Sequence, residues 1–199
     1  MSYPKFFDTV ETIKVKDPLS GILGAFESGE YEFTYQEIVK AAGHSCPTVA
    51  GAYLMTQVAL DRLYKDERAI RGNIEVAFKE SLEDGVAGVI GNVVSHITGA
   101  TDKSGFKGLA GKFSRHSLMH FNSNITSSAR FTRVDSGASL DINYDPNSIK
   151  PAPQMMQLMQ KMNSGEATQE DITLFGSLWQ DRVKRIFENI DTVITVEEL

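Results

Sequence analysis

The chain has 199 residues, 41% of them hydrophobic and 23% charged, which is typical of a folded globular protein. Its formal net charge of -6 and the lack of a Lys- and Arg-rich run argue against a nucleic-acid partner, and its single cysteine excludes an internal disulfide or a four-cysteine zinc site. No apolar stretch approaches the length of a membrane span, and residues 1–16 lack the apolar core of a signal peptide. We therefore expect a cytoplasmic protein that binds neither nucleic acid nor membrane.

The N-terminal segment contains a loose helical stripe, which is followed by a stronger helix signal. The apolar residues of the stripe are Phe6, Phe7, Val10, Ile13 and Val15. Thr34 and Glu37 form a capping-box pattern, in which each side chain satisfies a backbone N–H of the other residue. We therefore predict a helix over residues 35–42, and Gly43 is the residue type expected at its C-terminal cap.

The segment Gly43-His44-Ser45-Cys46-Pro47 leads into a second predicted helix, residues 48–64. Proline is favoured at the first position of a helix, so Cys46 is expected at the N-cap, where the helix dipole and free N–H groups favour a thiolate. The helix is apolar almost all round, which predicts a central, buried position. Because thiolate and imidazole are good zinc ligands, Cys46 and His44 are candidate metal ligands. The alternative is a buried thiol that behaves as a small hydrophobe, beside a hydrogen-bonded imidazole.

A strand and a third helix are predicted next. Residues 74–79 nearly alternate between apolar and polar side chains, which favours a strand. Asp84 is the predicted start of a helix that runs to about Ile97. Glycine occurs at every third position of this helix, at Gly85, Gly88 and Gly91, which indicates close packing or the close approach of a ligand. His96 lies on the same helix and is either a ligand or a core histidine with a satisfied ring.

Residues 98–112 form a glycine-rich loop that also contains lysines. Backbone N–H groups and ammonium groups can together hold an anion, so Gly99, Lys107 and Lys112 are candidate binding residues. The loop matches neither a Walker A pattern nor a dinucleotide-binding fingerprint. A flexible surface loop is the alternative.

The remainder of the chain predicts strands and then helices. Three β-rich pieces lie near residues 115–121, 129–134 and 139–144, with a hairpin turn between the last two. Two helices are expected over residues 154–162 and 168–189. The fold class is therefore α+β, with a central buried helix against an antiparallel or mixed sheet. We divide the chain into a core, residues 1–145, and a C-terminal helical extension, residues 146–199, that packs on the core.

Two ordered motifs resemble those of the FmdE family, which takes its name from a component of formylmethanofuran dehydrogenase. The first is Gly43-His44-x-Cys46-Pro47 with Gly51 in the following helix. The second is Thr98-Gly99-Ala100-Thr101, followed by the glycine-rich loop and Gly111-Lys112 before a strand. The similarity spans residues 37–121. It implies an α+β core, a metal site at the His-x-Cys motif that often holds zinc, and a tendency to dimerise.

This chain departs from the family pattern at positions that matter for a metal site. Members often carry a further histidine where this chain has Ala42, and a cysteine where it has Ala100. Other side chains must then complete the ligand set. The replacements that we consider first are His96, Asp84 and Glu83, and the second choices are His116 and His120.

Our hypothesis is a homodimeric metal-binding protein that holds zinc or another divalent transition metal through His44, Cys46 and His96. The glycine-rich loop would form one wall of a pocket for a small anionic ligand. The alternative is a non-catalytic accessory or metal-handling module for a redox enzyme, because the methionine-rich residues 155–162 offer an adaptable binding surface. A third possibility is that Cys46 acts without metal, as a nucleophilic or redox thiol.

Overall fold

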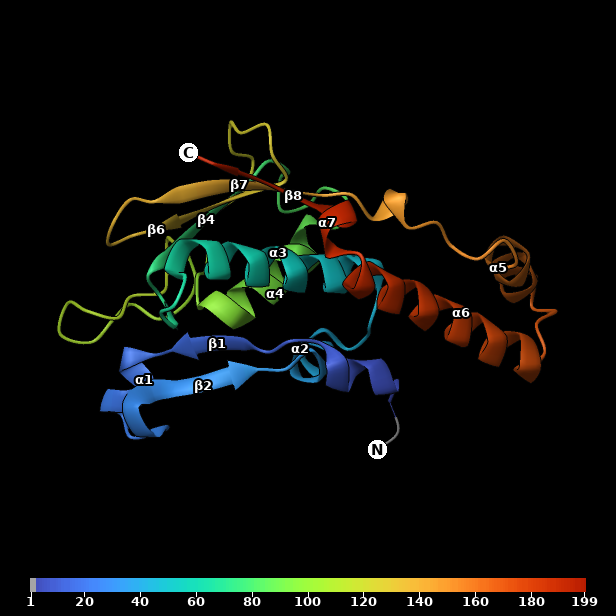
Figure 1. Ribbon diagram of the computed structural model, residues 1–199, viewed down its shortest axis with the longest axis horizontal. Helices are drawn as coiled ribbons and strands as arrows, with labels where there is room; N and C mark the ends of the chain where they lie inside the picture. The colour runs from blue at the N-terminus through green and yellow to red at the C-terminus, as the bar shows by residue number, and fades with distance from the viewer. Residues whose placement is uncertain (1–2) are drawn as a thin grey trace.

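Two β-sheets lie on opposite sides of a central helical layer in the computed structural model, which describes residues 3–199 (Figure 1). The smaller sheet has the strand order β2-β1-β3 and the larger one the order β5-β4-β6-β7-β8. This arrangement confirms the predicted α+β class. Among the described residues, no helix combines the length and apolar character needed to cross a bilayer.

The smaller sheet consists of three short strands: β1 (Ile13–Lys16), β2 (Glu30–Phe33) and β3 (Ala69–Ile70). The helical stripe predicted for the N-terminus holds only for a 3-10 turn (η1, Lys5–Thr9); three residues later the chain enters β1, so the prediction is wrong for Ile13 and Val15. Ile13 and Val15 are buried while Lys14 is exposed, so this segment follows the two-residue period of a strand. A short helix, α1 (Pro18–Ile22), and a 3-10 turn, η2 (Glu27–Gly29), connect β1 to β2.

The larger sheet is mixed. Its strands are β4 (Ile74–Phe78), β5 (Met119–His120), β6 (Ala129–Arg133), β7 (Ser139–Tyr144) and β8 (Ile194–Glu198). β5 pairs with β4 in parallel, and all the other pairs are antiparallel. The predicted hairpin is the β6–β7 pair, and β4 forms where the alternating pattern predicted a strand.

The central layer is built around α3 (Pro47–Tyr64), and most of its residues are buried, as predicted. α2 (Tyr35–Ala42) precedes it and begins with the predicted capping box, in which Thr34 and Glu37 exchange backbone-to-side-chain hydrogen bonds of 3.2 and 2.8 Å. Gly43 closes α2 with a φ of 80°, a left-handed conformation that glycine adopts without strain. Local caps therefore fix the junction between α2 and α3.

Tyr144 packs directly on the first turns of α3. A Cβ atom added to Gly51 would overlap the Tyr144 ring, so the absence of a side chain at Gly51 allows this close approach. The Tyr144 hydroxyl donates a 2.6 Å hydrogen bond to the Pro47 carbonyl. The end of β7 is thus attached to the N-terminal end of α3.

α4 (Ala87–Thr98) packs against α3 and begins three residues later than the sequence predicted. Asp84 instead accepts a 3.4 Å hydrogen bond from the Ser81 N–H in the preceding turn. A Cβ atom on Gly91 would lie 2.7 Å from Cζ of Phe121, so this glycine serves close packing.

The C-terminal part of the chain leaves the larger sheet after β7 and returns to it. It contains η3 (Pro146–Ser148), α5 (Met155–Ser164), α6 (Gln169–Glu188) and α7 (Ile190–Val193), and ends in β8. α5 and the first half of α6 project from the body, whereas the second half packs on α3 (Figure 1). The two helices were predicted, but β8 was not. β8 pairs with β7 over five residues, so part of the extension belongs to the sheet.

Candidate functional site

Cys46 occupies the predicted N-cap of α3. Its Sγ accepts a hydrogen bond from the Val49 N–H at 3.4 Å, and only 8% of the residue is exposed. Burial raises the pKa values of Tyr35 and Tyr144, and a negative charge on the nearby Cys46 would raise both further. The sulfur therefore lies in the core beneath the helix junction.

The residue next to Cys46 is held by the C-terminal helix α6. Trp179 Nε1 and Gln180 Nε2 both donate to the Ser45 carbonyl, at 2.9 and 3.2 Å. The Ser45 and Tyr35 hydroxyls are 2.9 Å apart and share a hydrogen bond. The sequence analysis assigned no role to Trp179; the signal that could have found it is the indole N–H, which usually needs an acceptor when it is buried.

His44 points in a different direction from Cys46. It is exposed, and its Nδ1 lies 3.1 Å from the Ala42 carbonyl. A carbonyl only accepts, so Nδ1 carries the proton in this contact, and in the neutral imidazole Nε2 then has the lone pair that a metal or a ligand donor can use.

His44 and His96 meet at one cavity of about 280 Å³ between α2 and α4, which we call the histidine cavity. The other lining residues are Ile38, Ala41, Ala42, Val89, Asn92 and Val93. Cys46 is not among them. Of the three predicted metal ligands, the structure thus brings two to the same cavity.

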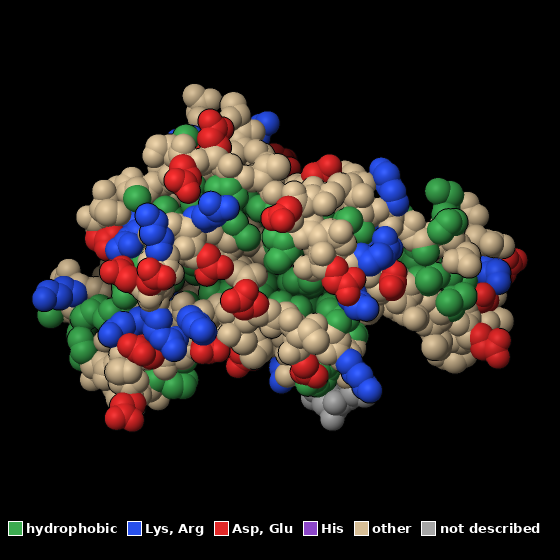
Figure 2. All heavy atoms as spheres, viewed as in Figure 1, with side chains coloured by type: hydrophobic (Ala, Val, Ile, Leu, Met, Phe, Trp, Pro, Cys, Tyr) green, Lys and Arg blue, Asp and Glu red, His purple; other side chains and the backbone are tan. Residues whose placement is uncertain are grey.

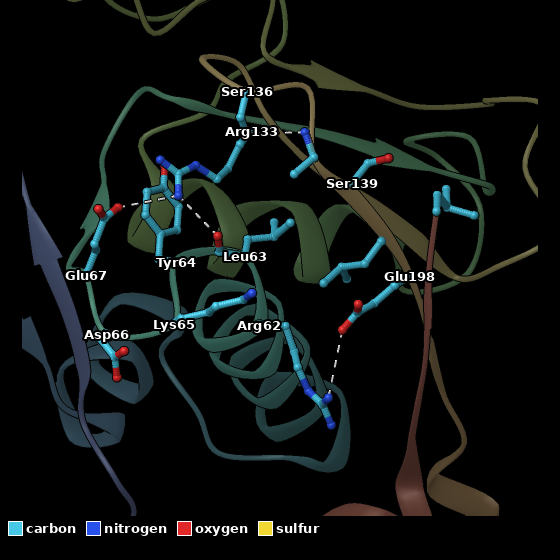
Figure 3. A pocket seen from close by; sticks show the side chains of 13 residues that line it. Arg62, Leu63, Tyr64, Lys65, Asp66, Glu67, Arg133, Ser136, Ser139 and Glu198 are labelled. Atoms are coloured by element: carbon cyan, nitrogen blue, oxygen red, sulfur yellow. Dashed lines mark hydrogen bonds and ion pairs between the residues drawn. The ribbon is translucent and has the colours of Figure 1, made fainter.

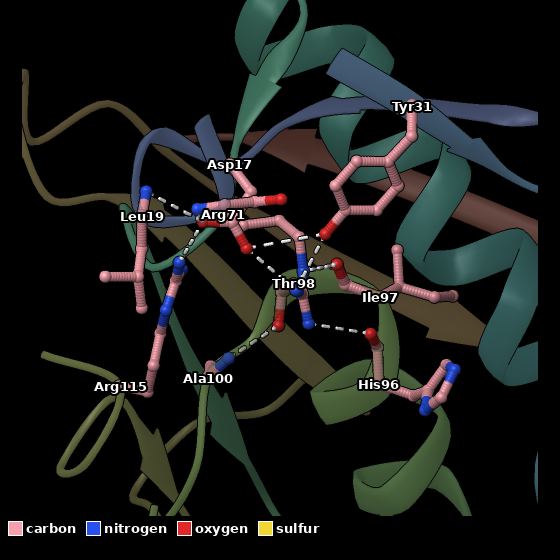
Figure 4. Close-up of polar contacts among 10 residues, drawn as sticks. Asp17, Leu19, Tyr31, Arg71, His96, Ile97, Thr98, Ala100 and Arg115 are labelled. Atoms are coloured by element: carbon pink, nitrogen blue, oxygen red, sulfur yellow. Dashed lines mark hydrogen bonds and ion pairs between the residues drawn. The ribbon is translucent and has the colours of Figure 1, made fainter. Parts of the chain in front are cut away.

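Arg71 and Phe33 position His96 at the end of α4. Arg71 donates to the carbonyls of His96 and Ile97 at 3.0 and 2.9 Å, which satisfies two backbone acceptors at the helix end (Figure 4). The His96 ring packs against Phe33, with 5.5 Å between ring centroids. Burial, followed by the positive charge of Arg71, lowers the pKa of His96 from its ordinary value, which favours the neutral imidazole.

The other candidate ligands lie elsewhere. His116 shares a 2.9 Å hydrogen bond with the hydroxyl of its neighbour Ser117, and His120 Nε2 lies 2.8 Å from Glu75 Oε1. Glu83 and Asp84 are exposed in the turn before α4. Across residues 3–199, no three or more His, Cys, Asp or Glu side chains are grouped so that they could hold a metal ion.

The glycine-rich loop is anchored through its own backbone and through Arg115. Gly99 caps α4, Lys107 Nζ donates to the Lys103 carbonyl at 3.2 Å, and Lys112 pairs with Leu109 in an isolated bridge. None of Gly99, Lys107 and Lys112 lines the histidine cavity. Their role in anion binding stays a prediction.

A larger, polar cavity of about 590 Å³ lies at the other end of α3, and no motif in the sequence pointed to it. The Arg133 guanidinium lies 4.0 Å from the centroid of the Tyr64 ring and also contacts Glu67 (Figure 3). It pairs with Asp135 as well. Arg62 approaches Glu198 at 3.9 Å across the same cavity. Because most of its charges are balanced by neighbours in the wall, we assign no ligand to it.

The two sheets, the helical layer between them and the cavity beside the α2–α3 junction define an α+β protein with a candidate ligand site formed by two histidines. The family model for FmdE, "Molybdenum formylmethanofuran dehydrogenase operon", matches residues 41–195. The chain therefore belongs to the FmdE family, as its motifs predicted.

A solved structure also resembles this chain. It is the crystal structure of a tungsten formylmethanofuran dehydrogenase FmdE-like protein from Syntrophus aciditrophicus, and it is 12% identical in sequence. The match covers 84% of this chain and 72% of that chain, with a TM-score of 0.44. No curated protein matches the chain significantly.

Proposed function

We propose that this FmdE-family chain binds a divalent transition metal in the histidine cavity, with zinc as the first candidate. The observation that supports it is the convergence of His44 and His96, from two different elements, on one cavity. The hydrogen bond from His44 Nδ1 to a backbone carbonyl is the kind of contact that orients a metal-ligating imidazole.

The residues of one chain supply only part of a zinc site. A structural zinc ion takes four protein ligands, and a catalytic one takes about three plus water. The histidine cavity offers two imidazoles, and its remaining lining residues have no thiol or carboxylate. We therefore propose that a second copy of the chain completes the site, so that two imidazoles from each copy surround one ion.

The direct experiment measures metal content in protein purified without added metal. We expect about one ion per two chains by elemental analysis, and a dimer by light scattering. His44→Gln and His96→Gln should each remove the metal and weaken the dimer, because each removes two of the four proposed ligands. His116→Gln, a matched change outside the cavity, should retain both.

Several results would contradict this proposal. One such result is a folded wild-type protein that contains less than about a tenth of an ion per chain. Another is a double variant, His44→Gln with His96→Gln, that still retains the metal. Cys46→Ser, which keeps an oxygen at the N-cap, tests separately whether the thiol contributes. Cys46 does not line the histidine cavity, so loss of metal in Cys46→Ser would mean that the junction between α2 and α3 rearranges when the metal binds.

A second candidate function is an accessory or metal-handling module that docks on a redox enzyme. The projecting hairpin of α5 and α6 favours it, because Met156 and Met159 are 73% and 43% exposed there. Figure 2 shows hydrophobic side chains on the surface of this projection. Methionine side chains adapt readily to a partner surface.

Affinity capture from the native host checks the accessory function. A stable complex with a redox enzyme is expected for the wild-type chain and should be lost with Met156→Glu and Met159→Glu together. The matched variant Gln157→Glu with Gln160→Glu adds the same charge to the same helix and should retain the complex. Recovery of the chain alone, as a homodimer, would count against the accessory function.

A further inference from the structure

A third cavity, of about 340 Å³, lies at one end of the larger sheet, and we call it the sheet-end cavity. α4 and its N-cap contribute to this cavity and to the histidine cavity, but with different residues. Val86, Ala87 and Ile90 line the sheet-end cavity, whereas the lining of the histidine cavity starts at Val89. The two cavities share no residue, and the volume of the sheet-end cavity is in the range of small-molecule sites.

The floor of the sheet-end cavity is apolar. Met55 of α3, Phe78 of β4, and Ala87 and Ile90 of α4 form it. Met55, Phe78 and Ala87 are 1–3% exposed, so they are core residues that show one face to the cavity. A hydrocarbon or aromatic body would find van der Waals contacts there and would lose its contact with water.

The rim of the same cavity is polar and includes hydrogen-bond donors. The lining includes the Lys79 ammonium and the hydroxyls of Thr48 and Thr126. Asn143 Oδ1 accepts the Ser128 N–H at 3.0 Å, so the Asn143 NH2 group remains available as a donor. The lining also contains one carboxylate, Glu80, and its hydroxyls can accept as well as donate.

The start of α4 adds a further positive contribution. The lining residue Val86 is the N-cap of this helix, yet it makes no side-chain cap hydrogen bond, and the first turn has no acidic residue. The positive end of the helix dipole is therefore not capped from within α4, and the nearest acidic group of the lining is Glu80, whose Oε2 lies 3.9 Å from the position of a Cβ atom on Gly85. Ammonium, amide and helix end all favour a negatively charged group at the rim.

We propose that the sheet-end cavity binds a small organic carboxylate, with its apolar body on Met55 and Phe78 and its carboxylate near Lys79 and Asn143. This site goes beyond the proposed metal function and does not depend on it. It also lies at a different place from the glycine-rich loop, where the sequence analysis predicted anion-binding residues.

The experiment uses three probes with the same body and different charge: 3-phenylpropanoate, the neutral 3-phenylpropanamide and the cationic 3-phenylpropylamine. Binding to the full chain is measured by ligand-observed NMR titration. We expect the acid to bind about tenfold more tightly than the amide, as a charge-assisted hydrogen bond provides. The amine should bind more weakly than both probes.

Two exposed positions give variants that leave the core intact. Lys79→Met should reduce the affinity for the acid to that for the amide, whereas the matched Lys103→Met, in the glycine-rich loop, should leave it unchanged. Thr126→Trp should close the rim and remove the binding of all three probes. Chelation of metal should change none of these affinities, which separates this test from that of the metal site.

Any of four results would overturn the proposal. These are no saturable binding of the acid up to about 10 mM, an amide that binds as tightly as the acid, an amine that binds more tightly than the acid, or affinity for the acid that neither Lys79→Met nor Thr126→Trp reduces.

Discussion

Replacing Asp17 by alanine should lower the free energy of unfolding by about 3–5 kcal/mol, because it leaves two buried or half-buried arginines without their anion. Asp17 accepts from Arg115 at 2.7 Å and from Arg71 at 2.9 Å, and the three side chains are only 8%, 9% and 20% exposed, in the order Asp17, Arg115, Arg71. The Asp17 carboxylate also caps α1 by accepting the Leu19 and Ser20 N–H groups. No other carboxylate of the described chain forms an ion pair with either arginine.

Figure 4 shows why this loss should affect more than one element. Asp17 follows β1 and caps α1, Arg71 satisfies the carbonyls at the end of α4, and Arg115, which follows the glycine-rich loop, donates to Asp17. Arg115 Nη1 is buried without a hydrogen-bond partner even with Asp17 in place. Removal of the carboxylate therefore leaves the guanidinium with a large uncompensated desolvation cost.

Chemical denaturation at neutral pH, followed by circular dichroism, measures this effect. Asp181→Ala is the matched control, because Asp181 pairs with Arg185 at 2.9 Å but is 54% exposed, and it should cost less than about 1 kcal/mol. Equal losses of stability in the two variants would show that the Asp17 network is no stronger than a surface ion pair.

Gly51→Ala should be destabilising by about 1–3 kcal/mol, although alanine is the better helix former, because the new methyl group overlaps the Tyr144 ring. The ring must move away from α3, and its hydrogen bond to the Pro47 carbonyl is then lost or lengthened. This variant therefore tests the contact between Gly51, a residue of the first family motif, and Tyr144, the last residue of β7.

A double-mutant cycle with Tyr144→Val checks this explanation. Once the ring is gone, Gly51→Ala should stabilise the protein, by up to about 1 kcal/mol, through helix propensity alone. The reversal of sign is the decisive observation. If Gly51→Ala remains destabilising without the ring, a different contact must account for the glycine.

The parts of the fold that local chemistry determines could be predicted from the sequence. The Thr34 capping box, the Gly43 cap and the Pro47 start of α3 depend on neighbouring residues only, and all three are confirmed. β1 and β8 could not be predicted in the same way. Each is only four or five residues long, and each becomes a strand by pairing with a distant segment.

The candidate site shows the same limit. The spacing of His44 and Cys46 predicted that they lie on one junction, but not that the imidazole faces α4 while the sulfur faces the core. That outcome depends on where α4 packs, and on Trp179 and Gln180, which hold the Ser45 carbonyl from more than a hundred residues away. Contacts of that range leave no periodic signature in a sequence.

The return of the chain to β7 has a consequence for variation within this fold. Tyr144 and Ile194 are paired neighbours in the sheet, although fifty residues separate them in sequence. The segment between them thus begins and ends about one strand spacing apart. The outer portion of this segment, α5 with the adjoining half of α6, therefore projects from the body while its two ends are held together in the sheet. We expect that this portion can be lengthened, shortened or exchanged without a change in the architecture that carries the histidines.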